Sequence, residues 1–215
     1  MKLNSKKSKI ILLGTGNPNP DPNRFGPSVA VIVSDSSYLV DFGAGITRRT
    51  YSAFTELGIN ALETSRLTKG FLTHLHSDHT IGYPDLILTS WVMGRSQPLE
   101  IYGPKGTQEM TDYILKAFNH DIKERLEGLE PANHIGYKVI VKEIKPEIFY
   151  DDEYINVKAF PVNHGNLESF GFRFIMEDKD IVISGDTAPF DDCVEYYEGC
   201  DILIHEVYCS KKFEE

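Results

Sequence analysis

Three histidines and an aspartate fall within six consecutive residues, His74-Leu75-His76-Ser77-Asp78-His79. Neutral imidazole and carboxylate are ligands that divalent zinc, iron and manganese favour. Because alternate side chains of an extended backbone point the same way, His74 and His76 can reach one metal ion. If the chain then bends, Asp78 and His79 can turn toward a second ion. The chain has seven histidines in all, so three in one hexapeptide favour a metal site over a polar loop that is rich in histidine by chance.

Two more ligand-type side chains follow strands that we expect in the second half of the chain. His164 comes just beyond the strand expected over 155–160. Asp186 comes just beyond the strand expected over 180–184. Loops fixed by strand ends are where sites are usually built. Taken alone, His164 indicates an ordinary histidine and Asp186 a turn residue or a helix N-cap, but together with the hexapeptide both become candidate metal ligands.

The elements that must position these residues follow from turn formers and apolar periodicity. Short apolar runs predict strands over 10–13, 28–33, 38–41, 70–73, 99–102, 137–144, 155–160, 170–176, 180–184 and 201–204. Those over 10–13 and 201–204 are expected to be buried. Helical spacing predicts helices over 46–57, 80–92, 107–118 and 191–197, with a short helix or mobile cap over 119–136. Strands with interspersed helices predict layered α and β structure rather than an alternating βαβ pattern.

Composition places the chain among soluble globular proteins. At 215 residues, 41% hydrophobic and 25% charged, a single domain over 1–215 is the default. The net charge of −10 gives no general support to extended nucleic-acid binding, because an acidic surface repels polyanions. Cys193, Cys200 and Cys209 have no Cys-x-x-Cys spacing, so reduced thiols in the cytoplasm fit best. No apolar stretch approaches the length of a membrane span.

The chain resembles the metallo-β-lactamase superfamily, and within it the branch around ribonuclease Z. The matching stretches run in family order over nearly the whole chain: Leu13-Gly14-Thr15-Gly16, Pro27-Ser28, Val40-Asp41-Phe42-Gly43-Ala44-Gly45, residues 73–79, Tyr102-Gly103-Pro104-Lys105-Gly106, His164-Gly165, Ser184-Gly185-Asp186-Thr187 and His205-Glu206. The hexapeptide together with His164 and Gly185-Asp186-Thr187 is a specific signature of the family, whereas any one of these stretches alone would be weak support for the resemblance.

The resemblance implies a four-layer αββα sandwich with two divalent metal ions at one edge of the packed sheets, zinc first and manganese or iron as alternatives. It implies that the first ion is bound by His74, His76 and His164. It implies that the second is bound by Asp78 and His79, with Asp186 bridging both. Asp41 would orient these ligands from behind, and His205-Glu206 would lie near the site in a supporting or proton-relay role.

Such a site implies hydrolysis. Two ions about 3.5–4 Å apart can share a water and lower its pKa toward ~7, and the resulting hydroxide is the nucleophile. Asp78 is the natural group to orient the water or receive its proton, and His205 is a candidate proton donor to the leaving group. A phosphodiester is the favoured substrate because of the branch. A carboxylic ester, lactone, sulfate ester or β-lactam stays open, since fold analogy alone cannot choose.

Two departures from the family bear on the substrate and on the chain's extent. Ribonuclease Z typically carries a long tRNA-gripping arm between the third histidine and the bridging aspartate, but only 21 residues separate His164 from Asp186 here. This favours a small-molecule or short phosphodiester substrate over tRNA.

The family's last histidine ligand should follow His205, yet no histidine does, so we expect a truncated chain that lacks the last helix and strand. Relatives are often dimers, so the resemblance also implies that a homodimer can form.

Two other classes of function compete with the hydrolase. The same fold hosts iron-dependent redox proteins, but the diiron oxygen-reducing relatives typically have glutamate where His76 stands. A non-catalytic metal-binding module gains weight only if the natural protein ends at Glu215.

Overall fold

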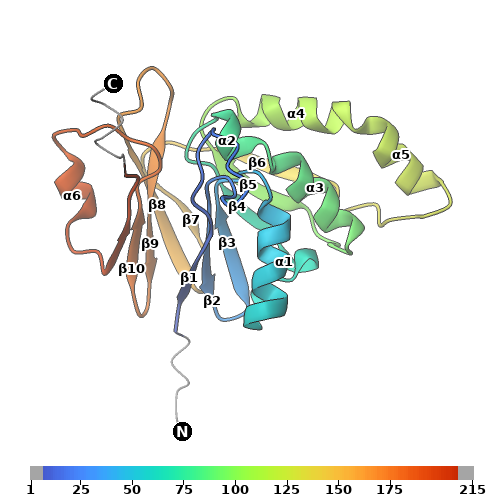
Figure 1. Ribbon diagram of the computed structural model, residues 1–215, viewed down its shortest axis with the longest axis horizontal. Helices are drawn as coiled ribbons and strands as arrows, with labels where there is room; N and C mark the ends of the chain where they lie inside the picture. The colour runs from blue at the N-terminus through green and yellow to red at the C-terminus, as the bar shows by residue number, and fades with distance from the viewer. Residues whose placement is uncertain (1–6, 208–215) are drawn as a thin grey trace, which may run out of the picture. The chain divides into compact units, whose positions relative to one another are not determined.

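Two β-sheets and six α-helices organise residues 7–207, the part of the chain that the computed structural model describes (Figure 1). The chain divides into two compact units, Met1–Ile144 and Lys145–Glu215. The expected single domain over 1–215 stays a prediction. Within residues 7–207, no helix combines the length and the apolar character needed to cross a membrane.

The sheet of the first unit is mixed. Its strands in spatial order are β1 (Lys9–Gly14), β2 (Ser28–Val33), β3 (Ser36–Val40), β4 (Lys69–Phe71), β5 (Leu99–Gly103) and β6 (Val139–Glu143). The first three strands pair antiparallel, and β3 to β6 pair parallel. Because parallel neighbours end at the same edge of a sheet, the segments that follow β3 and β4 emerge side by side. Asp41 follows β3, and the histidine-rich segment follows β4.

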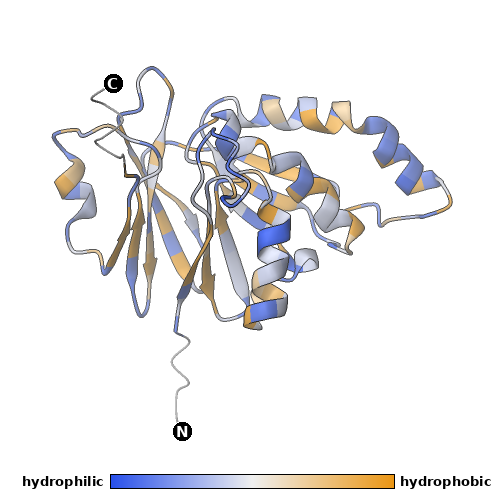
Figure 2. Ribbon diagram, viewed as in Figure 1, coloured by the Kyte–Doolittle hydropathy of each residue, from blue (hydrophilic) through white to orange (hydrophobic). Residues whose placement is uncertain are grey.

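Helices of the first unit bury their apolar sides in a core with the sheet. They are α1 (Ile46–Leu57), α2 (Ser77–Thr80), α3 (Tyr83–Val92), α4 (Thr107–Ala117) and α5 (Asn119–Glu127), with short 3₁₀ helices at Asn60–Leu62 and Thr64–Arg66. The core includes Leu39, Leu62, Leu86 and Ile101, all fully buried. Figure 2 shows hydrophobic residues along the strands and α3, whereas α5 is mostly hydrophilic.

The second unit holds a sheet in the order β11 (Ile202–Ile204), β10 (Asp180–Ile183), β9 (Phe170–Met176), β8 (Ile155–Pro161) and β7 (Ile148–Asp151). Strands β7 to β10 pair antiparallel, and β11 pairs parallel with β10 after the short helix α6 (Cys193–Tyr197). Both β8 and β10 are antiparallel to β9, so they run in the same direction. The segments after them, which carry His164 and Asp186, therefore leave the sheet at the same edge.

Most of the predicted elements are confirmed, and two of the differences concern position in the sheets. The run over 10–13 was expected to be buried, but β1 lies at a sheet edge and Leu12 is 52% exposed. The run over 201–204 was also expected to be buried, but β11 is the edge strand of the second sheet and Leu203 is 42% exposed. Strand β7 was not predicted at all.

One predicted helix is divided in two. The spacing predicted a helix over 80–92, but the structure has α2 over Ser77–Thr80 and a new helix, α3, from Tyr83. Pro84 lies in the first turn of α3. Proline is tolerated there because the first N–H groups of a helix have no partner within the helix, so the second helix must begin next to it.

Candidate metal centre

The histidine-rich segment follows β4 as an irregular stretch with a bend at Thr73 and then enters α2. His74 is fully buried and His76 is exposed. His76 itself is extended, with φ −63° and ψ 150°, and immediately precedes the helix. The helix supplies the expected bend, because it carries Asp78 and His79 away from the line of the strand.

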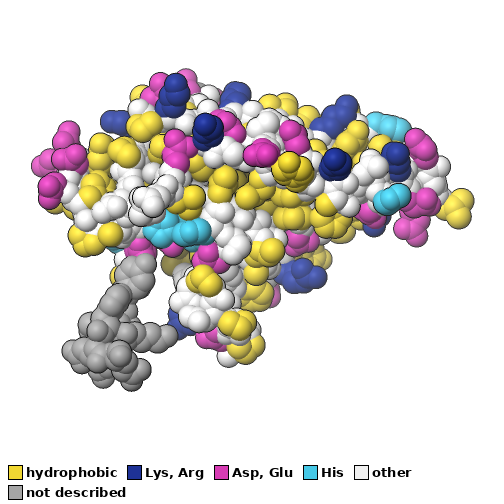
Figure 3. All heavy atoms as spheres, turned by 90° about the horizontal axis from the view of Figure 1, so that it is seen from above, with side chains coloured by type: hydrophobic (Ala, Val, Ile, Leu, Met, Phe, Trp, Pro, Cys, Tyr) yellow, Lys and Arg dark blue, Asp and Glu magenta, His cyan; other side chains and the backbone are white. Residues whose placement is uncertain are grey.

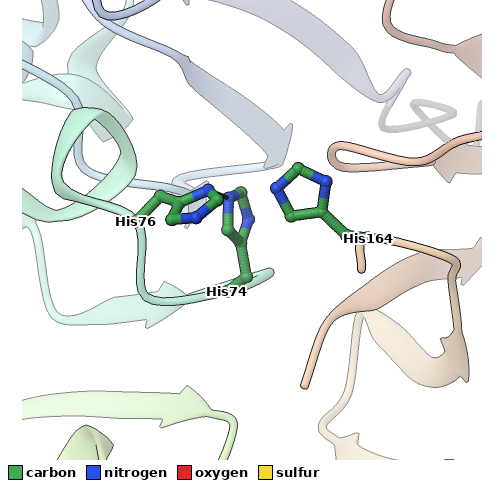
Figure 4. Close-up of side chains that lie close together, drawn as sticks. All are labelled: His74, His76 and His164. Carbon is green, nitrogen blue, oxygen red and sulfur yellow. Dashed lines mark hydrogen bonds between the residues drawn. The ribbon is translucent and has the colours of Figure 1, made fainter. Parts of the chain in front are cut away.

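His74 and His76 point nitrogen atoms at each other (Figure 4). His74 Nε2 lies 3.1 Å from His76 Nδ1, and the two rings meet at an interplanar angle of 80°. Two nitrogen ligands of one tetrahedral zinc ion, with bonds of about 2.0–2.1 Å, lie about 3.3 Å from each other. The observed spacing therefore suits a pair of ligands to one ion.

Asp78 and His79 form the second pair of the segment. His79 Nε2 lies 3.7 Å from Asp78 Oδ2, and the His79 side chain is 2% exposed. The other ring nitrogen, His79 Nδ1, lies 2.8 Å from Asp41 Oδ2. Since a carboxylate can only accept, Nδ1 carries the proton and Nε2 carries the lone pair that a metal ion would need.

Asp41 lies at the centre of the hydrogen bonds behind these candidate ligands. Its Oδ1 accepts from the backbone N–H of Thr73 at 2.8 Å, and its Oδ2 accepts from the Thr73 hydroxyl at 2.8 Å. Asp41 has a left-handed backbone with φ 59°, which is uncommon outside glycine, asparagine and aspartate. These contacts suit a residue that orients metal ligands, the role that the resemblance implies for it.

Glycines let the Asp41 loop lie against the start of α3. The Phe42 N–H donates to the carbonyl of His79, and the Gly82 N–H donates to the carbonyl of Phe42. A Cβ atom added to Gly82 would lie 2.4 Å from the carbonyl oxygen of Gly43, closer than real Cβ contacts allow. The Asp41-Phe42-Gly43 stretch thus makes close backbone contact with His79 and Gly82, and this contact holds Asp41 beneath the histidine-rich segment.

In the second unit, the segments that carry His164 and Asp186 are joined by backbone pairing. Asn163 forms an isolated antiparallel bridge with Ala188, whose N–H donates to the Asn163 carbonyl at 2.7 Å. The Asn163 N–H donates to the Thr187 hydroxyl at 3.1 Å. His164 directly follows Asn163, and Asp186 directly precedes Thr187. Both His164 and Asp186 are partly buried.

Glu206 and His205 lie behind and beside the Asp186 turn. The Glu206 carboxylate accepts from the Thr187 N–H, and the Glu206 N–H donates to the Ser184 hydroxyl at 3.3 Å. His205 Nδ1 lies 2.7 Å from the Glu206 carbonyl oxygen. Since a carbonyl can only accept, Nδ1 of His205 carries a proton. Glu206 therefore supports the turn directly, whereas His205 has an exposed ring.

Tyr197 contacts His205 and was not singled out by the sequence. Its hydroxyl lies 3.3 Å from His205 Nε2, beside a hollow of 280 Å³ that is also lined by Phe190 and Thr187. Burial raises the pKa of Tyr197, and nearby Cys193 and Glu206 raise it further. Tyr197 is thus a protonated donor at neutral pH. The sequence offered only an aromatic pair in a short helix as its signal.

Comparison with known proteins covers both units. The family model described as anti-Pycsar protein Apyc1 matches residues 8–214. Ribonuclease Z of Mycobacterium bovis (strain BCG / Pasteur 1173P2) is 36% identical over 207 residues, which cover 93% of this chain and 70% of the relative. The crystal structure of human tRNase Z, short form, superposes with a TM-score of 0.73 at 28% identity, covering 97% of this chain and 83% of that one. The metallo-β-lactamase fold protein YhfI of Bacillus subtilis superposes with a TM-score of 0.69 at 16% identity, covering 91% and 69%.

Proposed function

Because this chain belongs to the Apyc1 family and to the ribonuclease Z-like branch of metallo-β-lactamase-fold proteins, we propose that it is a metal-dependent hydrolase of phosphodiester bonds. The mixed α/β fold with two sheets that the resemblance implied is confirmed. The observation that carries the proposal is the pair of imidazole nitrogens, His74 Nε2 and His76 Nδ1, 3.1 Å apart in a family of metallo-hydrolases.

We further propose that the chain holds two divalent ions. Following the family resemblance, His74, His76 and His164 would hold the first ion, and His79 would hold the second; these residues fall within two groups of side chains with suitable ligand atoms. Figure 4 draws the three imidazoles of the first group. Asp78 would add a ligand to the second ion, and Asp186 would bridge both. Imidazole nitrogen with carboxylate oxygen is a donor set that zinc accepts readily, and manganese or iron also fits it.

The side chains of the site divide the proton transfers between them. Bound divalent ions supply Lewis-acid polarisation of a phosphoryl oxygen and a lowered pKa for water. Asp78 has a partly exposed side chain, and we assign to its carboxylate the acceptance of the proton of the attacking water. We assign proton donation to the leaving group to His205. In its neutral form Nε2 accepts from the Tyr197 hydroxyl, so a protonated ring would carry the transferable proton on Nε2.

We propose a small-molecule or short phosphodiester rather than tRNA as the substrate. The chain between His164 and Asp186 folds as one hairpin of β9 and β10, as predicted, so these residues form no long arm. Figure 3 shows acidic, basic and histidine side chains mixed over α4 and α5, which is not the one-signed basic surface that binds a polyanion. The formation of a homodimer stays a prediction.

Metal removal tests the proposal. The protein loaded with zinc or manganese should hydrolyse bis(p-nitrophenyl) phosphate. Exhaustive chelation should reduce the rate by at least about a thousandfold, because Lewis-acid stabilisation is worth several kcal/mol. Adding back one metal at a time should restore the rate. Full activity in protein shown by elemental analysis to be metal-free would reject the proposal, and oxygen consumption by an iron-loaded sample would favour redox chemistry instead.

A further inference from the structure

A buried hydroxyl lies between Asp41 and His74. Thr73 is fully buried, and its Oγ1 lies 2.8 Å from Asp41 Oδ2 and 2.9 Å from His74 Nδ1. We propose that Asp41 and Thr73 form a relay that fixes the proton of His74 on Nδ1, so that one carboxylate prepares a ligand of each proposed ion. The consequence for metal affinity rests on the proposed function.

The direction of the relay follows from counting protons. Thr73 Oγ1 has a single proton to donate but can accept as well. Asp41 also accepts the Thr73 N–H and the His79 ring N–H, so it acts as an acceptor throughout. The Thr73 hydroxyl proton therefore goes to Asp41, and the oxygen of Thr73 is left to accept a proton from His74 Nδ1.

The opposite tautomer of His74 would leave a buried contact unsatisfied. If Nδ1 carried no proton, His74 and Asp41 would both need the one proton of the Thr73 hydroxyl. His74 and Thr73 are both fully buried, so water does not substitute for the missing donor. With the proton on Nδ1, the lone pair of His74 lies on Nε2, the atom that faces His76 Nδ1 at 3.1 Å.

The two histidines thus depend on Asp41 in different ways. His79 Nδ1 donates directly to Asp41 Oδ2 at 2.8 Å, whereas His74 reaches the same carboxylate only through Thr73. Loss of the Thr73 hydroxyl should therefore free the His74 tautomer and leave that of His79 unchanged. Thr73 is a positioning residue, because it would act on the proposed ion only through His74.

Ring tautomers in the metal-free protein test the relay without any assay of activity. Two-bond ¹⁵N–¹H spectra, recorded at an alkaline pH at which the ¹⁵N shifts themselves show neutral rings, should show His74 and His79 both protonated on Nδ1 in the unsubstituted protein. Thr73→Val keeps the side-chain shape without the hydroxyl and should shift His74 toward the Nε2–H tautomer. Thr73→Ser restores the hydroxyl and should restore the Nδ1–H tautomer, with His79 unchanged in both variants.

Metal affinity gives the second readout. We expect zinc to bind Thr73→Val about 10–100-fold more weakly, the usual effect of losing a partner behind a metal ligand, and Thr73→Ser to stay close to the unsubstituted protein. An Nε2-protonated His74 in the unsubstituted protein would overturn the relay even if Thr73→Val did not fold. Unchanged tautomer and affinity in Thr73→Val would overturn it as well. A protein with the expected tautomers but no hydrolytic activity would instead count against the proposed function alone.

Discussion

Replacing His76 with alanine should reduce kcat/KM for bis(p-nitrophenyl) phosphate by at least about a thousandfold, because one ligand of the proposed first ion is lost. The His76 ring is exposed, so its removal leaves no cavity in the core. We therefore expect the thermal unfolding of the metal-free variant to match that of the unsubstituted protein. Elemental analysis should show less bound metal per chain.

His120→Ala is the matched control for this prediction. His120 is also exposed, but it lies in α5 and has no proposed role. Its replacement removes the same side chain from the surface and should leave both the rate and the metal content unchanged. If His76→Ala retained activity within about tenfold of the unsubstituted protein, a loss of roughly 1.4 kcal/mol or less, the proposed ligand set would be wrong.

Replacing Arg95 with methionine should lower the free energy of unfolding by about 3–5 kcal/mol, because buried carbonyl groups would lose their donors. The guanidinium of Arg95 is fully buried, and burial lowers its pKa to about 10. Its five hydrogen bonds end on the backbone carbonyls of Leu67, Leu86, Ile87 and Gly136. Methionine has a similar length but no N–H group. Urea denaturation of the metal-free protein measures the loss.

Arg48→Met provides the control for Arg95. The Arg48 side chain is 78% exposed, and its ion pair with Asp85 is long, with 3.8 Å between Nη1 and Oδ2. A surface ion pair of this kind is worth about 0–1 kcal/mol, so the control variant should lose little stability. Equal losses in the two variants would contradict the assigned role of Arg95, since they would show that removing any arginine has the same cost.

Arg95 also shows how the segment after α5 is attached to the core. Asn133 Nδ2 donates to the Arg95 carbonyl at 2.9 Å, and Trp91 Nε1 donates to the Asn133 carbonyl at 2.7 Å. The sequence predicted a short helix or a mobile cap over 119–136. The structure has the helix, α5. The end of the segment is fixed against α3 by these side-chain hydrogen bonds, which no local sequence pattern indicates.

Local patterns were sufficient to predict most of the elements and the ligand-type residues. The helix over 46–57 and the strand over 170–176 have the predicted bounds, because apolar spacing and flanking glycine act within a few residues. Ligand-type side chains were recognisable because histidine and aspartate are chemically distinctive and follow strand ends. Their assignment to two metal ions came from the family resemblance and stays a proposal.

The sequence by itself determined which residues are candidates for the chemistry, and only the tertiary structure decided what lies behind them. Thr73 looks like the last residue of a strand until β3 and β4 pair in parallel and bring Asp41 beneath it. The burial of β1 and β11 was mispredicted for a related reason, since apolar content is local but position in a sheet is not. Strand order depends on contacts between distant segments, and no short window of sequence contains both partners of such a contact.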